Sequence, residues 1–201
     1  MAKIKFSKTE LKRQRDQLKQ FARFLPTLQL KKQQLQLEVM RLKEEILVHH
    51  HKMETFRSSL ADWIGLFGIA EADVVAVQVE ITNVSIEYRN IAGVDIPILQ
   101  DVGFRSVDYD PFVVSPWVDT GIETLQNLIR LELAGRVLAR QRSLIDDELR
   151  VTTQRVNLFE KVKILEARNT IRRIQIYLGD QRTAAVGRAK IVKNQLSLPA
   201  A

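Results

Sequence analysis

Apolar residues recur with a seven-residue period over the first third of the chain. One row consists of Leu11, Leu18, Leu25, Lys32, Val39, Ile46, Met53 and Leu60. A second row, offset by three residues, consists of Gln14, Phe21, Leu28, Leu35, Leu42, His49, Phe56 and Trp63. Thirteen of these sixteen positions are apolar, and the phase never breaks. The pattern therefore predicts a long helix that winds around a partner helix with a left-handed supercoil.

The start of this helix has a local signal of its own. Ser7-Lys8-Thr9-Glu10 is a capping box, in which Ser7 accepts from the amide of Glu10 and Glu10 reaches back to the amide of Ser7. Pro26 lacks an amide proton and crowds the preceding turn. Since the same phase resumes at Leu28, we expect a kink or a local loosening near Leu25 and not the end of the helix.

The helical pattern stops at Gly65, and a period of two follows. Val75, Val77, Val79 and Ile81 alternate with less apolar residues, which predicts a strand. The phase changes near Asn83, which indicates a bulge. Residues 90–93 are predicted to form a turn and residues 94–98 a short returning strand, with residues 104–107 as a candidate further strand. Pro97 cannot donate to a ladder, so its strand should lie at a sheet edge.

A second long helix is predicted after Ser115-Pro116-Trp117, where serine and proline suit a helix start. Its apolar spacing is looser than that of the first helix. One stretch consists of Ile145, Leu149, Thr152, Val156 and Phe159, and the next consists of Ile164, Ala167, Ile171, Ile174 and Leu178. The second stretch is one residue out of phase with the first. Such a slip changes the supercoil locally without ending the helix.

Together these elements predict a mainly α fold, namely a long two-helix antiparallel coiled coil with a small middle segment that contains a β-hairpin. We expect three parts in one elongated unit: an N-terminal helix over residues 1–64, a β-rich knob over residues 65–115 and a C-terminal helix over residues 116–201. The second helix is the longer one, so part of it must run past its partner or pack on the knob. Both chain ends would lie at one pole.

The charged residues are distributed unevenly among the same three parts of the chain. The chain carries 31 Lys and Arg against 24 Asp and Glu. Residues 1–32 hold ten basic and two acidic residues, residues 65–115 hold two basic and eight acidic residues, and residues 182–201 hold four basic and no acidic residues. A uniformly basic nucleic-acid binder does not show this division. The ends are positive and the middle is negative, so the two ends favour an acidic partner.

Catalytic and metal-binding signatures are not evident. Neither of the two common glycine-rich phosphate-binding motifs occurs, and cysteine is absent. His49, His50 and His51 are consecutive and point about 100° apart on a helix, so they cannot share one metal. We expect one of them in the helix seam and two in solvent. No cofactor, metal site or membrane-spanning segment is predicted.

The basic residues at the two ends are the candidate partner-binding surface, with simple solubility as the alternative. They include Lys3, Lys5, Lys8, Lys12, Arg188, Lys190 and Lys193. Two other functions fit the same pattern less well. A nucleic-acid-binding coiled coil would use the basic ends, but it does not explain the acidic middle. A scaffold that holds two partners apart has the same fold and differs only in its partners.

Three short motifs occur in order along the chain. The first is Lys8-Thr9-Glu10-Leu11 followed by Leu30-Lys31-Lys32-Gln33-Gln34-Leu35. The second is Asn90-Ile91-Ala92-Gly93-Val94-Asp95-Ile96-Pro97. The third is Arg155-Val156-Asn157-Leu158-Phe159-Glu160. In this order the three motifs resemble the D subunit of the vacuolar- and archaeal-type rotary ATPases, where methionine is usual at the position of Ala92. The C-terminal run Arg188-Ala189-Lys190-Ile191-Val192-Lys193-Asn194 is similar to the bacterial branch of that family.

This resemblance implies a non-catalytic rotor shaft that transmits torque between the catalytic ring of A and B subunits and the ion-translocating ring in the membrane. The terminal helices would insert into the bore of the A/B ring. The middle, with Asn90, Gly93, Val94 and Pro97 in its motif, would face the F subunit and the subunit that caps the membrane rotor ring. The chain would be a peripheral part of the complex at the cytoplasmic face of the membrane.

Overall fold

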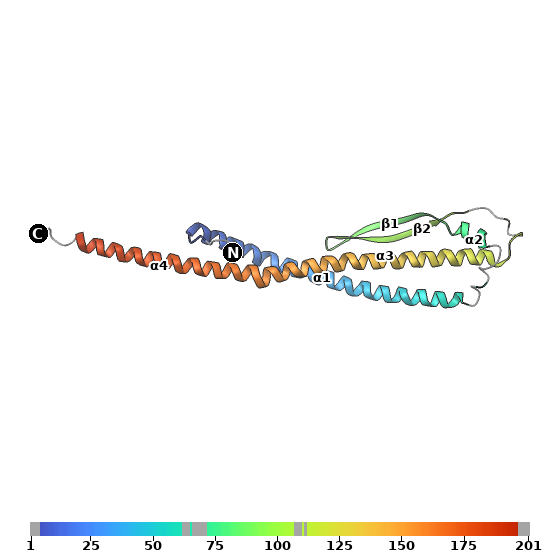
Figure 1. Ribbon diagram of the computed structural model, residues 1–201, viewed down its shortest axis with the longest axis horizontal. Coiled ribbons are helices and arrows are strands. Elements are labelled where there is room, and N and C mark those ends of the chain that lie inside the picture. Colours follow the sequence, from blue (N-terminus) through green and yellow to red (C-terminus); the bar gives the residue numbers. More distant parts are fainter. Residues whose placement is uncertain (1–4, 62–64, 66–71, 107–109, 111, 197–201) are drawn as a thin grey trace. The chain divides into compact units, whose positions relative to one another are not determined.

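The computed structural model describes residues 5–61, 65, 72–106, 110 and 112–196. It is mainly helical, with long helices and one two-stranded antiparallel sheet (Figure 1), so the predicted fold class is confirmed. Backbone contacts divide the chain into two compact units. Unit 1 comprises residues 1–32 and 151–201, and unit 2 comprises residues 33–150. The predicted three-part division stays a prediction.

Helix α1 spans Lys8–Leu60 and passes through Pro26 without ending. Its N-terminus is capped as expected at Ser7, whose Oγ accepts from the amide of Glu10 at 3.2 Å. The reciprocal half of the capping box is wrong, because the amide of Ser7 donates to the carbonyl oxygen of Lys5 at 3.1 Å. The carboxylate of Glu10 accepts instead from Gln14 Nε2 at 2.8 Å.

The two predicted heptad rows form the covered face of α1. Every described residue in both rows is buried or half-buried, including the polar residues Gln14, Lys32 and His49. Trp63, the last residue of the second row, lies outside the described residues. His50 and His51 are exposed, which confirms the prediction of one histidine in the seam and two in solvent.

The strand predicted near Val75 is wrong, because α2, a short helix, spans Ala72–Gln78 there. Val75 and Gln78 are buried while Val77 is exposed, so burial follows a helical spacing of three and not the alternation of a strand. Gln126 Nε2 on α3 donates to the carbonyl oxygen of Gln78 at 3.1 Å. Tertiary contacts such as this hydrogen bond thus override the β-propensity of the valines.

Strands β1 (Ile81–Ile91) and β2 (Val94–Phe104) form an antiparallel hairpin. The turn at Ala92 and Gly93 is confirmed. Both residues have positive φ, 50° and 80°, as a tight two-residue hairpin turn requires. The predicted bulge is also present, as a register shift between Ile81 and Asn83, and a second shift follows between Ser85 and Ile86.

Strand β2 is longer than the predicted returning strand of residues 94–98, because cross-strand pairing with β1 extends it to Phe104. Phe104 therefore ends β2 and does not begin a third strand, and Val107 lies outside the described residues. In this two-stranded sheet Pro97 sits on an edge strand, as expected.

The second helical region begins at Trp117, as predicted, and has three sections: α3 (Trp117–Asn157), the π-helix η2 (Leu158–Lys163) and α4 (Ile164–Leu196). A π-turn accommodates one more residue than an α-turn. The predicted one-residue slip falls between Phe159 and Ile164, within or next to η2. On either side, Thr152, Val156, Ile164, Ala167 and Ile174 are all buried.

The core of unit 2 joins α1, α3 and the hairpin. It consists of Leu35, Val39 and Leu42 from α1, Ile96 from β2 and Ile145 from α3. Residues around the hairpin turn (Ile91, Ala92 and Val94) pack against this cluster. The hairpin is therefore fixed to the helix pair at its turn, and Gln141 Nε2 on α3 adds a hydrogen bond to the carbonyl oxygen of Pro97.

In unit 1, two aromatic pairs set the direction of the helices. The rings of Phe21 and Phe159 have centroids 5.3 Å apart, and those of Phe6 and Tyr177 are 5.0 Å apart. As the residue number rises along α1, the number of its partner falls. The two helical segments of unit 1 are therefore antiparallel.

In unit 2, Gly135 of α3 lies against His49 of α1. A Cβ atom at Gly135 would lie 2.9 Å from His49 Nε2, and this buried nitrogen has no hydrogen-bond partner among the described residues. Alanine is favoured over glycine in a helix by about 1 kcal/mol. The steric conflict should cancel that gain as long as His49 is present.

We therefore expect Gly135→Ala to leave the free energy of unfolding unchanged or lower in the wild-type background. In a His49→Ala background the same change should raise it by about 1 kcal/mol. Urea denaturation of the two single variants and the double variant measures the coupling. An equal effect of Gly135→Ala in both backgrounds would show that the His49 side chain moves aside freely.

Candidate partner-binding surfaces

The predicted basic surface lies on two helical segments of unit 1. Lys5 precedes α1, and Lys8 and Lys12 lie in its first turns, all three exposed. Arg188, Lys190 and Lys193 lie near the end of α4 and are also exposed. Lys3 lies outside the described residues. We call the six described side chains the terminal basic surface.

The two halves of this surface lie at different levels along the helices. Phe6 contacts Tyr177, and Lys190 is thirteen residues further along α4. At about 1.5 Å per residue, this places Lys190 roughly 20 Å beyond Phe6. The α4 helix therefore runs past the start of α1, which confirms the expectation that the second helix outruns its partner.

The end of α4 is exposed throughout. Every residue from Gly179 to Gln195 is exposed, including the apolar residues Val186, Ile191 and Val192. An isolated helix of this length is marginal in water. A helix end with basic residues, small residues and uncovered apolar residues is typical of a segment that binds a partner.

The residues of the predicted central motif lie at the hairpin turn of unit 2. Asn90 Oδ1 accepts from the amide of Gly93 at 3.0 Å, and Asn90 Nδ2 donates to Asp95 Oδ1 at 2.6 Å. Val94 packs against the core cluster, and Pro97 is buried. These contacts assign the motif a structural task, which is to shape the turn and attach it to the helices. A partner-binding role for the motif stays a prediction.

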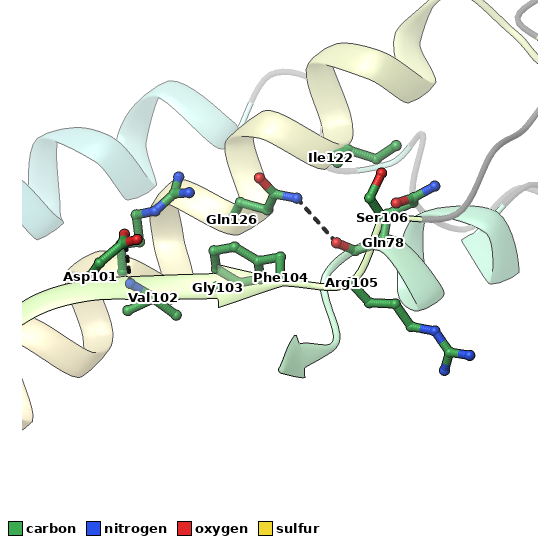
Figure 2. Close-up of a pocket in the computed structure, with 10 residues that line it drawn as sticks. Gln78, Asp101, Val102, Gly103, Phe104, Arg105, Ser106, Ile122 and Gln126 are labelled. Carbon is green, nitrogen blue, oxygen red and sulfur yellow. Dashed lines mark hydrogen bonds between the residues drawn. The ribbon is translucent and has the colours of Figure 1, made fainter. Parts of the chain in front are cut away.

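A cleft of about 580 Å³ lies where α2, the end of β2 and α3 meet. Figure 2 shows Gln126 on α3 reaching the carbonyl oxygen of Gln78, with Phe104 below it. The guanidinium of Arg130 lies 4.9 Å from the centroid of the Phe104 ring, and Asp101 Oδ1 accepts from the amide of Val102. These contacts join α2 and β2 to α3, and the lining contains no histidine or cysteine. The arrangement is that of a structural junction.

The described part of the chain offers neither a metal centre nor a membrane span. Its residues include no group of three or more histidine or acidic side chains that could hold a metal ion. None of its helices is long and apolar enough to cross a membrane.

One exposed surface, on the outer strand of the hairpin, was not predicted from the sequence. Every residue from Ile81 to Asn90 of β1 is exposed, whereas β2 buries Ile96, Pro97 and Val102. The alternation of Val84, Ile86 and Tyr88 was visible in the sequence, but alternation alone does not say whether a face is covered. Pro97 gave no signal for this surface, because the sheet edge that it predicted belongs to its own strand, β2.

Long antiparallel helices, a β-hairpin fixed to them at its turn, and an uncovered basic helix end define an assembly-forming coiled-coil protein. A family model that describes the D subunit of ATP synthase matches residues 10–194. The chain belongs to this family of ATP synthase D subunits, and the resemblance seen in the sequence motifs is confirmed.

Its relatives support this assignment over nearly their full length. The chain is 42% identical to the D subunit of a V-type ATP synthase from Borreliella burgdorferi over 98% of this chain and 96% of the relative. It is 30% identical to the V-type ATP synthase D subunit of Chlamydia muridarum over 97% of each chain. The protein of the same name from Chlamydia caviae is 29% identical over 97% of this chain and 94% of the relative.

Proposed function

We propose that this chain is the central-stalk subunit of a V/A-type rotary ATPase or ATP synthase and transmits torque between the catalytic A/B ring and the membrane rotor ring. Family membership supports a place in such a complex. The observation that carries the stalk role is the exposed end of α4, where every residue from 179 to 195 is exposed.

The physical argument for a shaft is stiffness combined with asymmetry. Two wound helices resist bending and twisting better than one helix does. Three equivalent catalytic pockets would each face a different surface of the chain at any moment. The contact free energy then differs among the pockets, and rotation moves that difference around the ring.

The composition of the α4 end suits a surface that must turn. A deep binding minimum at one orientation would stall rotation. The segment carries Arg188, Lys190 and Lys193 on long flexible side chains, among small residues such as Ala185 and Gly187. Exposed ion pairs contribute only about 0–1 kcal/mol each, so they attract a ring without fixing one angle.

The proposed partners follow the same division of the chain. The A and B subunits would surround the terminal basic surface, and ATP chemistry would take place in them and not in this chain. The F subunit and the subunit that caps the membrane rotor ring would bind unit 2. The chain would reach the membrane only through the complex, at its cytoplasmic face.

The torque role predicts a selective loss when charge is removed from the α4 end. Replacing Arg188, Lys190 and Lys193 with glutamine should leave the fold intact, because all three are exposed, and should lower the ratio of ions pumped to ATP hydrolysed several-fold. The matched control replaces Lys43, Lys52 and Arg57 of α1, which are also exposed and carry the same total charge.

Reconstitution of each triple variant with the other subunits in vesicles allows ATPase activity and ion uptake to be measured together. The control variant should show the wild-type ratio of ions pumped to ATP hydrolysed. If the α4 variant assembles and shows wild-type coupling and torque, basic docking of the α4 end is not part of the mechanism.

A further inference from the structure

The outer strand of the hairpin offers a free edge that no described residue of unit 2 covers. Strand β2 lies against the helices, and β1 is exposed along Ile81–Asn90. In an antiparallel pair, the backbone groups of alternate residues point away from the neighbouring strand. Such an edge is ready to pair with another chain. The regular register from Ile86 to Ile91 and the tight turn hold the end of this edge in a defined shape.

An apolar groove of about 470 Å³ accompanies this edge. One side is the face of β1 with Val84, Ile86 and Tyr88, which are 37%, 43% and 68% exposed. The other side is α3, with Leu133, Val137 and Leu144. Apolar side chains on a regular strand, exposed to this extent beside a groove, mark an interaction surface.

The charged residues of this groove indicate which side chains a bound partner segment would carry. Three charged residues line the groove, Asp95, Arg136 and Arg140. Asp95 accepts from Asn90 Nδ2, and Arg136 Nε pairs with Glu132 Oε1 at 3.2 Å. Arg140 makes no ion pair with any described residue. A carboxylate from a partner would therefore find a guanidinium without an ion-pair partner beside an apolar surface.

We propose that an extended segment of another subunit adds to β1 as a third strand. Its apolar side chains lie over Val84, Ile86 and Tyr88, and one of its carboxylates pairs with Arg140. Main-chain hydrogen bonds supply affinity and the alternate side chains supply specificity, as in other cases of strand addition. The identity of the partner as a subunit of the complex rests on the proposed function.

The test uses the full-length chain with the F subunit and the subunit that caps the rotor ring, each purified and added separately. Isothermal titration calorimetry measures binding to the wild type and to three variants. Ile86→Lys places a charge in the groove and should weaken binding at least about tenfold. Arg140→Glu should also weaken it. Ser85→Lys adds the same charge to β1 outside the groove and should bind like the wild type.

Hydrogen exchange separates strand addition from other occupants. Amides of Ile86–Asn90 that point away from β2 should exchange quickly in the free chain and become protected in the complex. A helix in the groove would cover side chains but leave these amides unprotected, which would overturn the proposal. Wild-type affinity of Ile86→Lys for both subunits, or binding of neither subunit to the wild-type chain, would overturn it as well.

Failure here is distinguishable from failure of the torque role. Binding to β1 is measured on the isolated chain without the catalytic ring or ATP. The torque role depends on Arg188, Lys190 and Lys193 in unit 1 and is measured in the assembled complex. If the α4 variant loses coupling while Ile86→Lys binds both subunits like the wild type, the torque role is supported and strand addition to β1 is overturned.

Discussion

Replacing Ile145 with aspartate should unfold unit 2. Ile145 is 0% exposed and packs with Leu35, Leu42 and Ile96, from α1 and from β2. Truncating such a side chain costs about 2–5 kcal/mol, and burying an unpaired carboxylate adds several kcal/mol. Domains are stable by only about 5–15 kcal/mol. The substitution therefore removes most or all of the stability of this unit.

The matched control is Ser143→Asp, which introduces the same residue two positions away on the exposed side of α3. Its effect should stay within about 0.5 kcal/mol. Ile145→Val, which removes one methylene, should cost about 0.5–1.5 kcal/mol. Circular dichroism melting compares the three variants. Equal melting curves for Ile145→Asp and Ser143→Asp would mean that the cluster around Ile145 does not hold unit 2 together.

The core that this experiment probes was largely predictable. Leu35, Val39 and Leu42 stand in the two heptad rows, and a seven-residue period is a strong signal because every two turns of the helix repeat it. The hairpin turn was predictable for a similar reason. Gly93 tolerates positive φ, and the pattern around it alternates. Local chemistry determines both features, so a single sequence is sufficient to find them.

Features that depend on distant contacts were not predictable. Residues 72–78 form a helix in which Val75 and Gln78 are buried, and the hydrogen bond from Gln126 on α3 to the carbonyl oxygen of Gln78 joins residues 48 positions apart. The hydrogen bond from Gln141 to Pro97 also joins distant segments. The sequence gives no signal for either of these hydrogen bonds, because a single glutamine on a helix is ordinarily solvated. Propensity therefore gave the wrong element at Val75.

The candidate binding surfaces divide in the same way. The terminal basic surface was visible as a charge imbalance, because charge counts need no structure. The groove beside β1 was not visible, although the alternation of Val84, Ile86 and Tyr88 with polar residues is typical of a strand. Whether an apolar strand face is core or interface depends on what packs over it. Here the helices cover β2 and leave β1 uncovered.

The π-helix η2 provides the second large expected effect. It spans Leu158–Lys163, at or beside the predicted one-residue slip of the apolar stripe. Successive helical residues are about 100° apart, so without an extra residue in a widened turn, Ile164 and Ala167 would leave the seam that contains Thr152 and Val156. The apolar pattern on both sides therefore demands the π-turn.

Deleting Lys161, an exposed residue of η2, should convert this segment to a regular α-helix. The deletion moves Ile164, Ala167 and Ile174 into phase with Val156, so unit 1 should keep its stability. Inserting an alanine after Lys161 does the opposite and turns those three side chains a further 100° or so from the seam. Loss of burial for two isoleucines alone costs about 3–6 kcal/mol.

The contrast between the two changes is the decisive result, because any length change disturbs a helix in a general way. Melting followed by circular dichroism, together with hydrogen exchange of residues 164–178, measures both variants against the wild type. A stable deletion and an unstable insertion show that η2 exists to absorb one surplus residue. Equal destabilisation by both would mean that the π-turn itself, and not the phase of the apolar stripe, is what unit 1 requires at this position.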